Sequence, residues 1–284
     1  MKYSTPLILV SNDDDITSKG IRVLVEAMRE LGEVVVVAPD RPQSGQGHAI
    51  TIGNPLRMTP SKLFGEEVRA YQTSGTPADC IKMGKHLVLR DRKPDLVVSG
   101  INHGSNTAIS VLYSGTMSAA LEAAIEGIPA IGFSLNDYQP EADFSHVIPF
   151  VQQIAQAVLE NGLTKGVALN VNFPAAVNGP ILGVRACRQA DARYMEHFEQ
   201  RRDPYKRPYY WLDGDFVNFD AGTDTDEWAL ANGYASVVPC KFDLTAYEAL
   251  DSLRSWQLID DSPIPADKAP DVPVSSASHP ADLG

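Results

Sequence analysis

The sequence predicts an α/β fold built on a doubly wound, mostly parallel sheet. Short apolar runs alternate with segments of helical periodicity over the first 175 residues, which is the pattern of successive strand–helix–strand units. Several runs are continuous and rich in valine and isoleucine, as expected for parallel strands that are covered on both faces. Beyond Pro174, charged and aromatic loops interrupt the strand-like pieces, so we expect extended hairpins there.

In the first half of the predicted core, buried strands alternate with two helices. Gly32 ends the first helix, and Pro77 suits the first turn of the second. The expected strands are residues 6–11, 33–40 and 94–100, with a small hairpin over 48–59 and a strand leading into a turn over 66–80. The expected helices are residues 21–32 and 77–89.

The second half of the core continues the alternation after a loop rich in glycine and asparagine at 101–115. Helices are expected over 115–127 and 142–160, and strands over 128–135 and 166–174. A further helix is expected over 243–258. We therefore divide the chain into a core (1–180), a hairpin and helix extension (181–261) and a tail (262–284). The tail is expected to be disordered because it is rich in proline and lacks periodicity.

Composition and charge exclude several classes of protein. The net charge of −12 argues against a nucleic-acid partner, since the only dense basic run, 201–207, is short. No apolar window is long enough for a membrane span, and residues 1–15 do not read as a secretion signal. The three cysteines lie far apart without a C-x-x-C motif, which favours buried thiols and a cytoplasmic protein.

Three polar loops are predicted to share one edge of the sheet. They are residues 12–15, 38–48 and 99–116, and each follows a predicted strand. Ligands of parallel α/β sheets gather at the carboxyl ends of the strands. The three loops are therefore the expected site.

The side chains of these loops are hard oxygen ligands, which suit Mg²⁺ or Mn²⁺ better than zinc. Asp13 and Asp14 can supply charge, and Ser44 and Asn102 can supply neutral oxygens. The residues 114–116 open a helix whose free N–H groups favour a phosphate. Hydrolysis of a phosphoester requires a cation that activates water and backbone amides that hold the phosphoryl oxygens. The alternative for each loop is structural, because an Asp-Asp pair after a strand is commonly a turn and helix cap.

The order of the motifs is more specific than any one of them. From N- to C-terminus the chain carries ILVSNDDD, VVVAPDRPQSG, SGTPADC, PDLVVSGINHGSN, LYSGTMSAALEAAIEGIPAIGFSL, ALNVNFP and TDEWALANGYASVVPCKFDLTA. This series resembles the SurE family of survival proteins over residues 6–257. The resemblance implies a Rossmann-like core and a metal-dependent phosphatase of nucleoside 5′-monophosphates, with 3′-nucleotides and short polyphosphate as further substrates. It also implies a homodimer or homotetramer that exchanges C-terminal segments.

The resemblance assigns roles to residues of this chain. It implies that one divalent cation per subunit, Mg²⁺ or Mn²⁺, is held by four ligands: Asp13, Asp14, Ser44 and Asn102. It implies that the substrate phosphate is held by Gly45, Asn106, Ser114, Gly115 and Thr116. The working hypothesis is attack by a metal-activated water on phosphorus, with Asp13 or Asp14 accepting its proton. Two positions depart from the usual family pattern: Asp15 replaces a glycine, and Lys19 replaces a proline.

Two other functions are compatible with parts of the sequence. Asp13-x-Asp15-x-Thr17 after an apolar strand is similar to the opening motif of haloacid-dehalogenase-like phosphatases, in which the first aspartate is the nucleophile. Asp215 lacks the buried strand that should precede that family's later motif. The second alternative is a nucleotide- or metal-sensing module on the same fold. Turnover in the presence of Mg²⁺ or Mn²⁺ would distinguish an enzyme from a sensor.

Overall fold

A computed structural model describes residues 5–256. The chain divides into two compact units, of which the first ends at Phe242 and the second begins at Asp243. In the second unit, a 3₁₀ turn at Tyr247–Ala249 leads into the short helix α6 (Leu250–Arg254). The helix expected over 243–258 is therefore much shorter than predicted. The expected tail, 262–284, lies outside the described residues.

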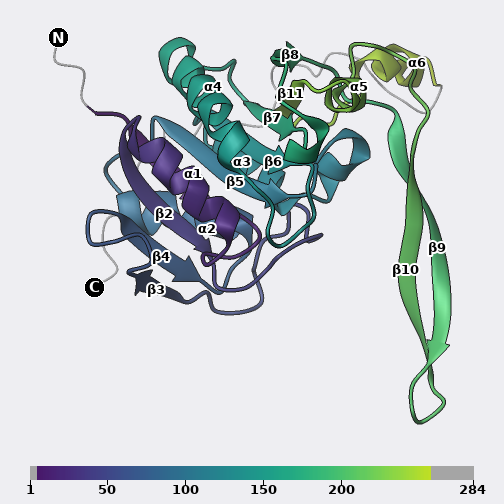
Figure 1. Cartoon of the computed structure of the whole chain (residues 1–284), viewed down its shortest axis with the longest axis horizontal. Coiled ribbons are helices and arrows are strands. Elements are labelled where there is room, and N and C mark those ends of the chain that lie inside the picture. The colour runs from purple at the N-terminus through teal and green to yellow at the C-terminus, as the bar shows by residue number, and fades with distance from the viewer. Residues whose placement is uncertain (1–4, 257–284) are drawn as a thin grey trace, which may run out of the picture. The chain divides into compact units, whose positions relative to one another are not determined.

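The first unit contains a nine-stranded sheet in the order β3-β4-β2-β1-β5-β6-β7-β11-β8 (Figure 1). The strands from β4 to β7 in this order are all parallel, which confirms the predicted fold class. The strands are β1 (Leu7–Ser11), β2 (Glu33–Pro39), β3 (Met58–Ser61), β4 (Arg69–Thr73), β5 (Leu96–His103), β6 (Ala130–Leu135), β7 (Val167–Phe173), β8 (Val184–Ala186) and β11 (Ala235–Lys241). Strands β8 and β11 lie in the expected extension, so part of that segment completes the sheet.

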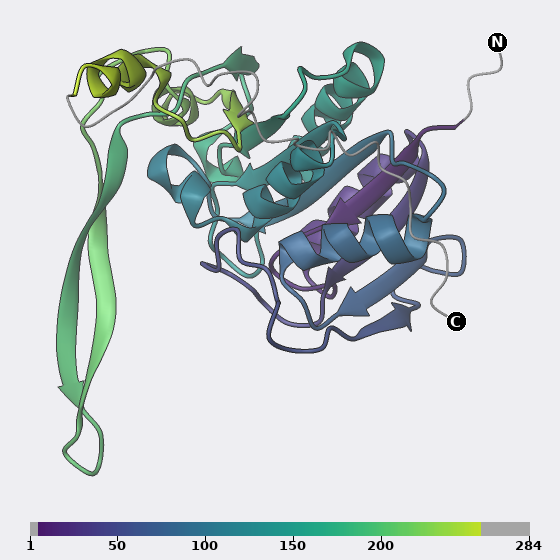
Figure 2. The same ribbon diagram turned by 180° about the vertical axis from the view of Figure 1, so that it is seen from behind.

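Helices cover both faces of the sheet. Helices α1 and α4 pack with one hydrophobic cluster and α2 and α3 with another; α1 lies before the sheet in Figure 1 and α2 before it in Figure 2. The helices are α1 (Lys19–Arg29), α2 (Pro77–Met83), α3 (Gly115–Ile125), α4 (Ile148–Asn161) and α5 (Asp226–Ala231), with a π-helical turn at Gly84–Leu89 and 3₁₀ turns at Ala108–Leu112, Ser145–Val147 and Ala176–Asn178.

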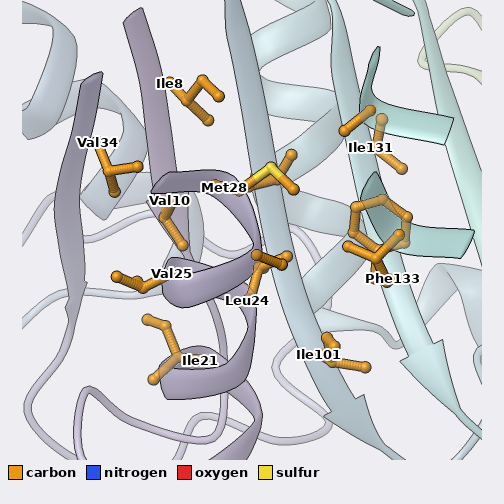
Figure 3. Close-up of a cluster of buried hydrophobic side chains, with 14 of the residues drawn as sticks. Ile8, Val10, Ile21, Leu24, Val25, Met28, Val34, Ile101, Ile131 and Phe133 are labelled. Atoms are coloured by element: carbon orange, nitrogen blue, oxygen red, sulfur yellow. The ribbon is translucent and has the colours of Figure 1, made fainter. Parts of the chain in front are cut away.

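The alternation of side chains along β1 explains the two layers. Ile8 and Val10 point into the α1 and α4 cluster, whereas Leu7 and Leu9 point into the α2 and α3 cluster. All four are fully buried. Successive side chains of a strand point to opposite faces, so a continuous apolar run needs a covered sheet on both sides. Figure 3 shows the first of these clusters, in which Leu24 and Met28 of α1 face the strands.

Helix α3 starts at the edge of the sheet where the candidate loops lie. The hydroxyl of Ser114 accepts a hydrogen bond from the N–H of Met117 at 3.0 Å, which is an N-cap interaction. Most of the helix is buried, and its alanines Ala119, Ala120 and Ala123 belong to the cluster shared with α2. Small side chains allow close approach to the strands, and the cap fixes the point at which the helix begins.

Two predicted elements differ from the structure. Residues 48–57 contain no strand. Of the hairpin expected over 48–59, only β3 forms; it begins at Met58 and pairs antiparallel with β4. Gly53 and Pro55 interrupt the expected hairpin, and Pro lacks the N–H that a ladder needs. Helix α4 begins at Ile148 rather than near residue 142, with Pro149 in its first turn.

The long hairpin predicted after Pro174 is present. Within residues 5–256, strands β9 (Ala192–Arg202) and β10 (Pro208–Asn218) pair only with each other, and the pair stands away from the nine-stranded sheet (Figures 1 and 2). Its outer part exposes large apolar side chains, including Phe198, Tyr210 and Trp211. The basic run 201–207 forms the turn and its flanks.

A candidate active site at the carboxyl edge of the sheet

Strand β1 lies between β2 and β5 and runs parallel to both, so the three candidate loops leave the sheet at the same edge. Backbone hydrogen bonds join them. The N–H of Gln43 donates to the carbonyl of Asp13 at 2.7 Å, and the N–H of Gly47 donates to the carbonyl of Tyr113 at 3.1 Å. The expected convergence of loops far apart in sequence is therefore present.

Asp13 is buried at this edge, at 4% exposed. Its Oδ1 accepts a hydrogen bond from the Thr116 hydroxyl at 2.5 Å. Burial raises the pKa of Asp13 to about 6, and the charge of Asp14 adds to this rise, whereas the hydrogen bonds from Thr116 lower the pKa. A buried carboxylate beside a second carboxylate is costly to ionise. A cation at this position would remove that cost.

Asp14 faces the third loop. Its Oδ2 accepts a hydrogen bond from the N–H of His103 at 3.3 Å. Burial raises the pKa of Asp14, the backbone hydrogen bond from His103 opposes the rise, and the charge of Asp15 adds to it. The two adjacent aspartates therefore contact different segments: Asp13 contacts the start of α3, and Asp14 contacts the end of β5.

Asp15 uses its side chain within its own turn. Its Oδ1 accepts from both the N–H and the hydroxyl of Thr17, each at 2.6 Å. Its φ of 91° lies in the region that favours glycine, which explains why a glycine suits this position. The Asp15 carboxylate is thus held by Thr17 and belongs to the turn before α1. Asp15, the second aspartate of the haloacid-dehalogenase-like motif, is thus committed to Thr17, and Asp215 lies on the exposed strand β10.

Asn102 presents an amide oxygen at the end of β5. Its Nδ2 donates to the carbonyls of His103 at 3.1 Å and Gly104 at 2.8 Å. These two bonds orient the amide and leave Oδ1 without a protein partner among residues 5–256. A neutral oxygen held in this way is a suitable hard ligand.

The second loop contributes exposed groups. Ser44 and Gly45 are both exposed, and Gly45 has a φ of 73°. In the described part of the chain, no hydrogen bond joins the Ser44 side chain to the other three candidate ligands. The loop is anchored next door, at Gln43, which is buried and bonds to Asp13. His48, four residues after Ser44, contacts Glu122 of α3 at 3.0 Å. This contact indicates a structural role for His48.

The start of α3 carries the candidate phosphate contacts Ser114, Gly115 and Thr116. The Ser114 hydroxyl accepts from Met117, which leaves its own hydrogen available. The Thr116 hydroxyl is committed to Asp13. Helix N-termini present free N–H groups and a positive dipole end. The segment can therefore hold an anion and also orient Asp13.

Asn106 is fixed by a buried network at the ends of β6 and β7. Its N–H donates to Asn172 Oδ1 at 2.7 Å, and its Nδ2 donates to Ser134 Oγ at 2.8 Å. Asn170 Nδ2 donates to the carbonyl of Asn106 at 2.8 Å. One hydrogen of the Asn106 amide remains for a ligand. Ser134, Asn170 and Asn172 were absent from the sequence prediction, although the alternating asparagines of ALNVNFP were the available signal.

Asp226 is a further buried residue that the sequence analysis did not single out. Its Oδ2 accepts from the N–H of Ala108 and its Oδ1 from the N–H of Ala190, both at 2.9 Å. It thereby joins the third loop, the segment leading into the hairpin and the start of α5. We call this arrangement the Asp226 clamp.

The candidate ligand set fits a hard divalent cation in its chemistry. Among residues 5–256, no group of three or more His, Cys, Asp or Glu side chains gathers as a metal site. The expected set has a different composition, with two carboxylates, one hydroxyl and one amide. The raised pKa values of Asp13 and Asp14 and the unpartnered Asn102 oxygen are the features that a bound cation would satisfy.

Gly115 tests how closely α3 approaches Asp13. A Cβ at this position would lie 2.6 Å from Asp13 Cβ and 2.8 Å from its Oδ2. We expect Gly115→Ala to displace the Asp13 carboxylate and to lower phosphatase kcat/KM by about tenfold or more. The control is Gly53→Ala, since no atom lies within 4 Å of the added Cβ there. Equal activity of the two variants would contradict the close approach of α3 to Asp13.

Comparison with known proteins identifies the family of the chain. The family model of the survival protein SurE matches residues 8–196. A protein of Cytophaga hutchinsonii named 5′-nucleotidase SurE is 68% identical over 257 residues, covering 90% of this chain and 99% of that protein. A protein of the same name from Christiangramia forsetii is 57% identical, with 92% and 100% covered. The crystal structure of the SurE protein from Aquifex aeolicus has a TM-score of 0.76 at 40% identity, covering 88% of this chain and 98% of that one.

Proposed function

The chain belongs to the SurE family, and we propose that it is a 5′-nucleotidase that hydrolyses nucleoside 5′-monophosphates with the help of one divalent cation, Mg²⁺ or Mn²⁺. The relatives of high identity are named 5′-nucleotidases. The observation that carries the proposal is the position of Asp13. Its buried carboxylate lies against the start of α3, where a phosphate and a cation would neutralise each other.

The residues divide into two groups by chemistry. The oxygens of Asp13, Asp14, Ser44 and Asn102 would hold the cation. When bound, a divalent cation lowers the pKa of water and offsets the charge of the phosphate. Either aspartate is a candidate acceptor for the proton of the attacking water.

The second group would orient the phosphate. The N–H groups of Gly45 and Gly115, the amide of Asn106 and the Ser114 hydroxyl are donors at this edge. Thr116 holds Asp13 through its hydroxyl, so we expect it to act on the phosphate only through its backbone. Fixed donors of this kind stabilise the charge that develops on phosphoryl oxygens.

We also propose that the protein assembles as a homodimer or homotetramer through its C-terminal segments. The hairpin exposes Phe198, Tyr205, Tyr210, Trp211 and Leu212 at 56–81%. A row of exposed large apolar side chains marks an interaction surface. A second copy of the chain is the partner that the family resemblance implies.

A cytoplasmic location follows from the cysteines and is part of the proposal. Cys80, Cys187 and Cys240 are all free, as in proteins of reducing compartments. Among residues 5–256, no helix has the length and apolar character needed to cross a membrane.

The test is phosphate release from nucleoside 5′- and 3′-monophosphates and short polyphosphate, first with EDTA and then with Mg²⁺ or Mn²⁺. We expect release only with the cation, fastest from 5′-monophosphates. Asp14→Asn should reduce it by on the order of a hundredfold. Asp91→Asn, an exposed aspartate before β5, is the control and should match the wild type. Cation binding without release from any phosphoester would instead indicate a sensing module.

A further inference from the structure

A cavity lies beside the third loop of the candidate site. Its volume is about 270 Å³. Its walls include the aromatic rings of Tyr138, Tyr194 and Phe216 and the polar side chains of Ser105, Asn136 and Glu227. None of these residues belongs to the cation or phosphate set. Aromatic walls with a few polar groups are typical of sites for planar organic ligands.

We propose that this cavity binds the nucleobase of the substrate, with Glu227 selecting a base that presents two adjacent N–H donors, which is guanine. The proposal rests on the proposed nucleotidase function, because it assigns a binding site to the nucleobase of the same nucleotide substrate.

The cavity adjoins the third loop through direct contacts. Gly104 follows the candidate ligand Asn102 by two residues, and a Cβ at Gly104 would lie 2.3 Å from the Tyr138 ring. The N–H of Gly104 also donates to the carbonyls of Leu135 and Asp137 at 2.8 and 3.1 Å. Ser105 of the cavity wall directly precedes the candidate phosphate residue Asn106. A ligand held by its phosphate at Asn106 therefore has this cavity next to it.

The three rings are available for stacking. Tyr138, Tyr194 and Phe216 are 62%, 44% and 36% exposed. Tyr194 and Phe216 stand edge to face, with centroids 5.1 Å apart, and Tyr194 interacts with the Tyr138 hydroxyl. Exposed rings that support one another form a platform, and bases stack on such platforms with substantial affinity. Base stacking would explain why aromatic rings are exposed at this polar edge of the sheet.

Glu227 provides the polar edge. A carboxylate only accepts hydrogen bonds, and its two oxygens match a pair of parallel N–H donors. Guanine presents such a pair at N1 and N2. Uracil presents a single N–H on the corresponding edge, so its bond to Glu227 is expected to be weaker.

The Asp226 clamp joins three of the segments that surround the cavity. Asp226 bonds to Ala108 of the third loop and to Ala190 before Tyr194, and its Oδ1 also accepts from the N–H of Glu227 at 2.9 Å. Ala108, Ala190 and Ala192 pack together as a small buried cluster. The hairpin base, the third loop and Glu227 are thus fixed relative to one another, as specific recognition requires.

The experiment compares kcat/KM for GMP, UMP and ribose 5-phosphate, which shares the phosphate and sugar but lacks a base. We expect Tyr194→Ala to lower kcat/KM for GMP at least about tenfold more than for ribose 5-phosphate. Glu227→Gln, which keeps the size of the side chain, should lower the GMP to UMP ratio about fivefold or more. Asp91→Asn, at an exposed position before β5 and outside the cavity, should leave both ratios at the wild-type value.

The outcomes separate the two proposals. If Tyr194→Ala lowers kcat/KM for GMP and ribose 5-phosphate by the same factor, or lowers neither, the base site is overturned while the nucleotidase stands. If the wild type releases phosphate from none of the three, the nucleotidase is overturned. Calorimetric titration with guanosine then tests the cavity alone: binding lost in Tyr194→Ala supports it, and equal or absent binding overturns it.

Discussion

Asp13→Asn is expected to abolish phosphate release while leaving the protein at least as stable as the wild type in EDTA. The amide keeps an oxygen for the Thr116 hydroxyl, which donates to Asp13 Oδ1 at 2.5 Å. The substitution removes a buried negative charge next to Asp14, and both burial and that charge raise the pKa of Asp13 to about 6. We expect kcat/KM to fall by at least about a thousandfold, because the site loses a charged ligand for the cation.

Thermal unfolding provides the independent measurement. The wild type should unfold at a higher temperature when Mn²⁺ is added, because a ligand that binds only the folded state stabilises it, by about 2.7 kcal/mol at a hundred times its dissociation constant. Asp13→Asn should lose most of that rise. Asp14→Asn should lose it too, and Asp91→Asn should retain it. Near-normal turnover in a folded Asp13→Asn protein would refute the assignment of the site.

Asp226→Ala is expected to be among the most destabilising single substitutions in the molecule. It leaves the N–H groups of Ala108 and Ala190 buried without the acceptors that now lie at 2.9 Å. An unsatisfied buried donor costs about 1–3 kcal/mol, so the free energy of unfolding should fall by about 2–5 kcal/mol. The unfolding midpoint should fall by roughly 5–10 °C. Activity should fall as well, because Ala108 anchors the loop that carries Asn106.

The neighbouring Asp224→Ala is a matched control. Asp224 pairs with Arg188 at 3.0 Å, and its side chain is 66% exposed. Exposed ion pairs contribute about 0–1 kcal/mol, so this variant should differ little from the wild type in denaturant unfolding. If both variants lose the same stability, the clamp has no special role.

The sequence predicted the sheet because its signals are local. Continuous apolar runs such as residues 33–40 require a covered parallel strand, and Gly32 and Ser114 mark helix ends. The prediction of a hairpin over 48–59 was wrong because alternation of apolar and polar residues does not by itself ensure strand pairing. Ile50 and Ile52 are exposed. Whether residues 48–57 pair depends on tertiary contacts that periodicity does not report.

The convergence of the candidate loops was predictable, because the carboxyl ends of parallel strands lie at the same edge of the sheet. Asp13 and Asp14 follow β1 and Asn102 lies at the end of β5, and these two strands are neighbours in the sheet. The supporting residues were not predictable in the same way. Asp226 lies more than a hundred residues from Ala108, and its role arises from backbone N–H groups, which leave no trace in residue identity. The cavity likewise depends on where the hairpin starts relative to the third loop.

The central place of β1 has a consequence for the order of events during folding. Ile8 pairs with Leu96 in the sheet, so a loop of almost ninety residues must close before Asp14 can meet His103. Closing such a loop is entropically costly and slows folding. A nascent or refolding chain would therefore be unable to assemble the proposed cation site early, even after most of its ligands have been synthesised. Binding of the proposed cation would mark the moment at which the two halves of the parallel sheet have joined.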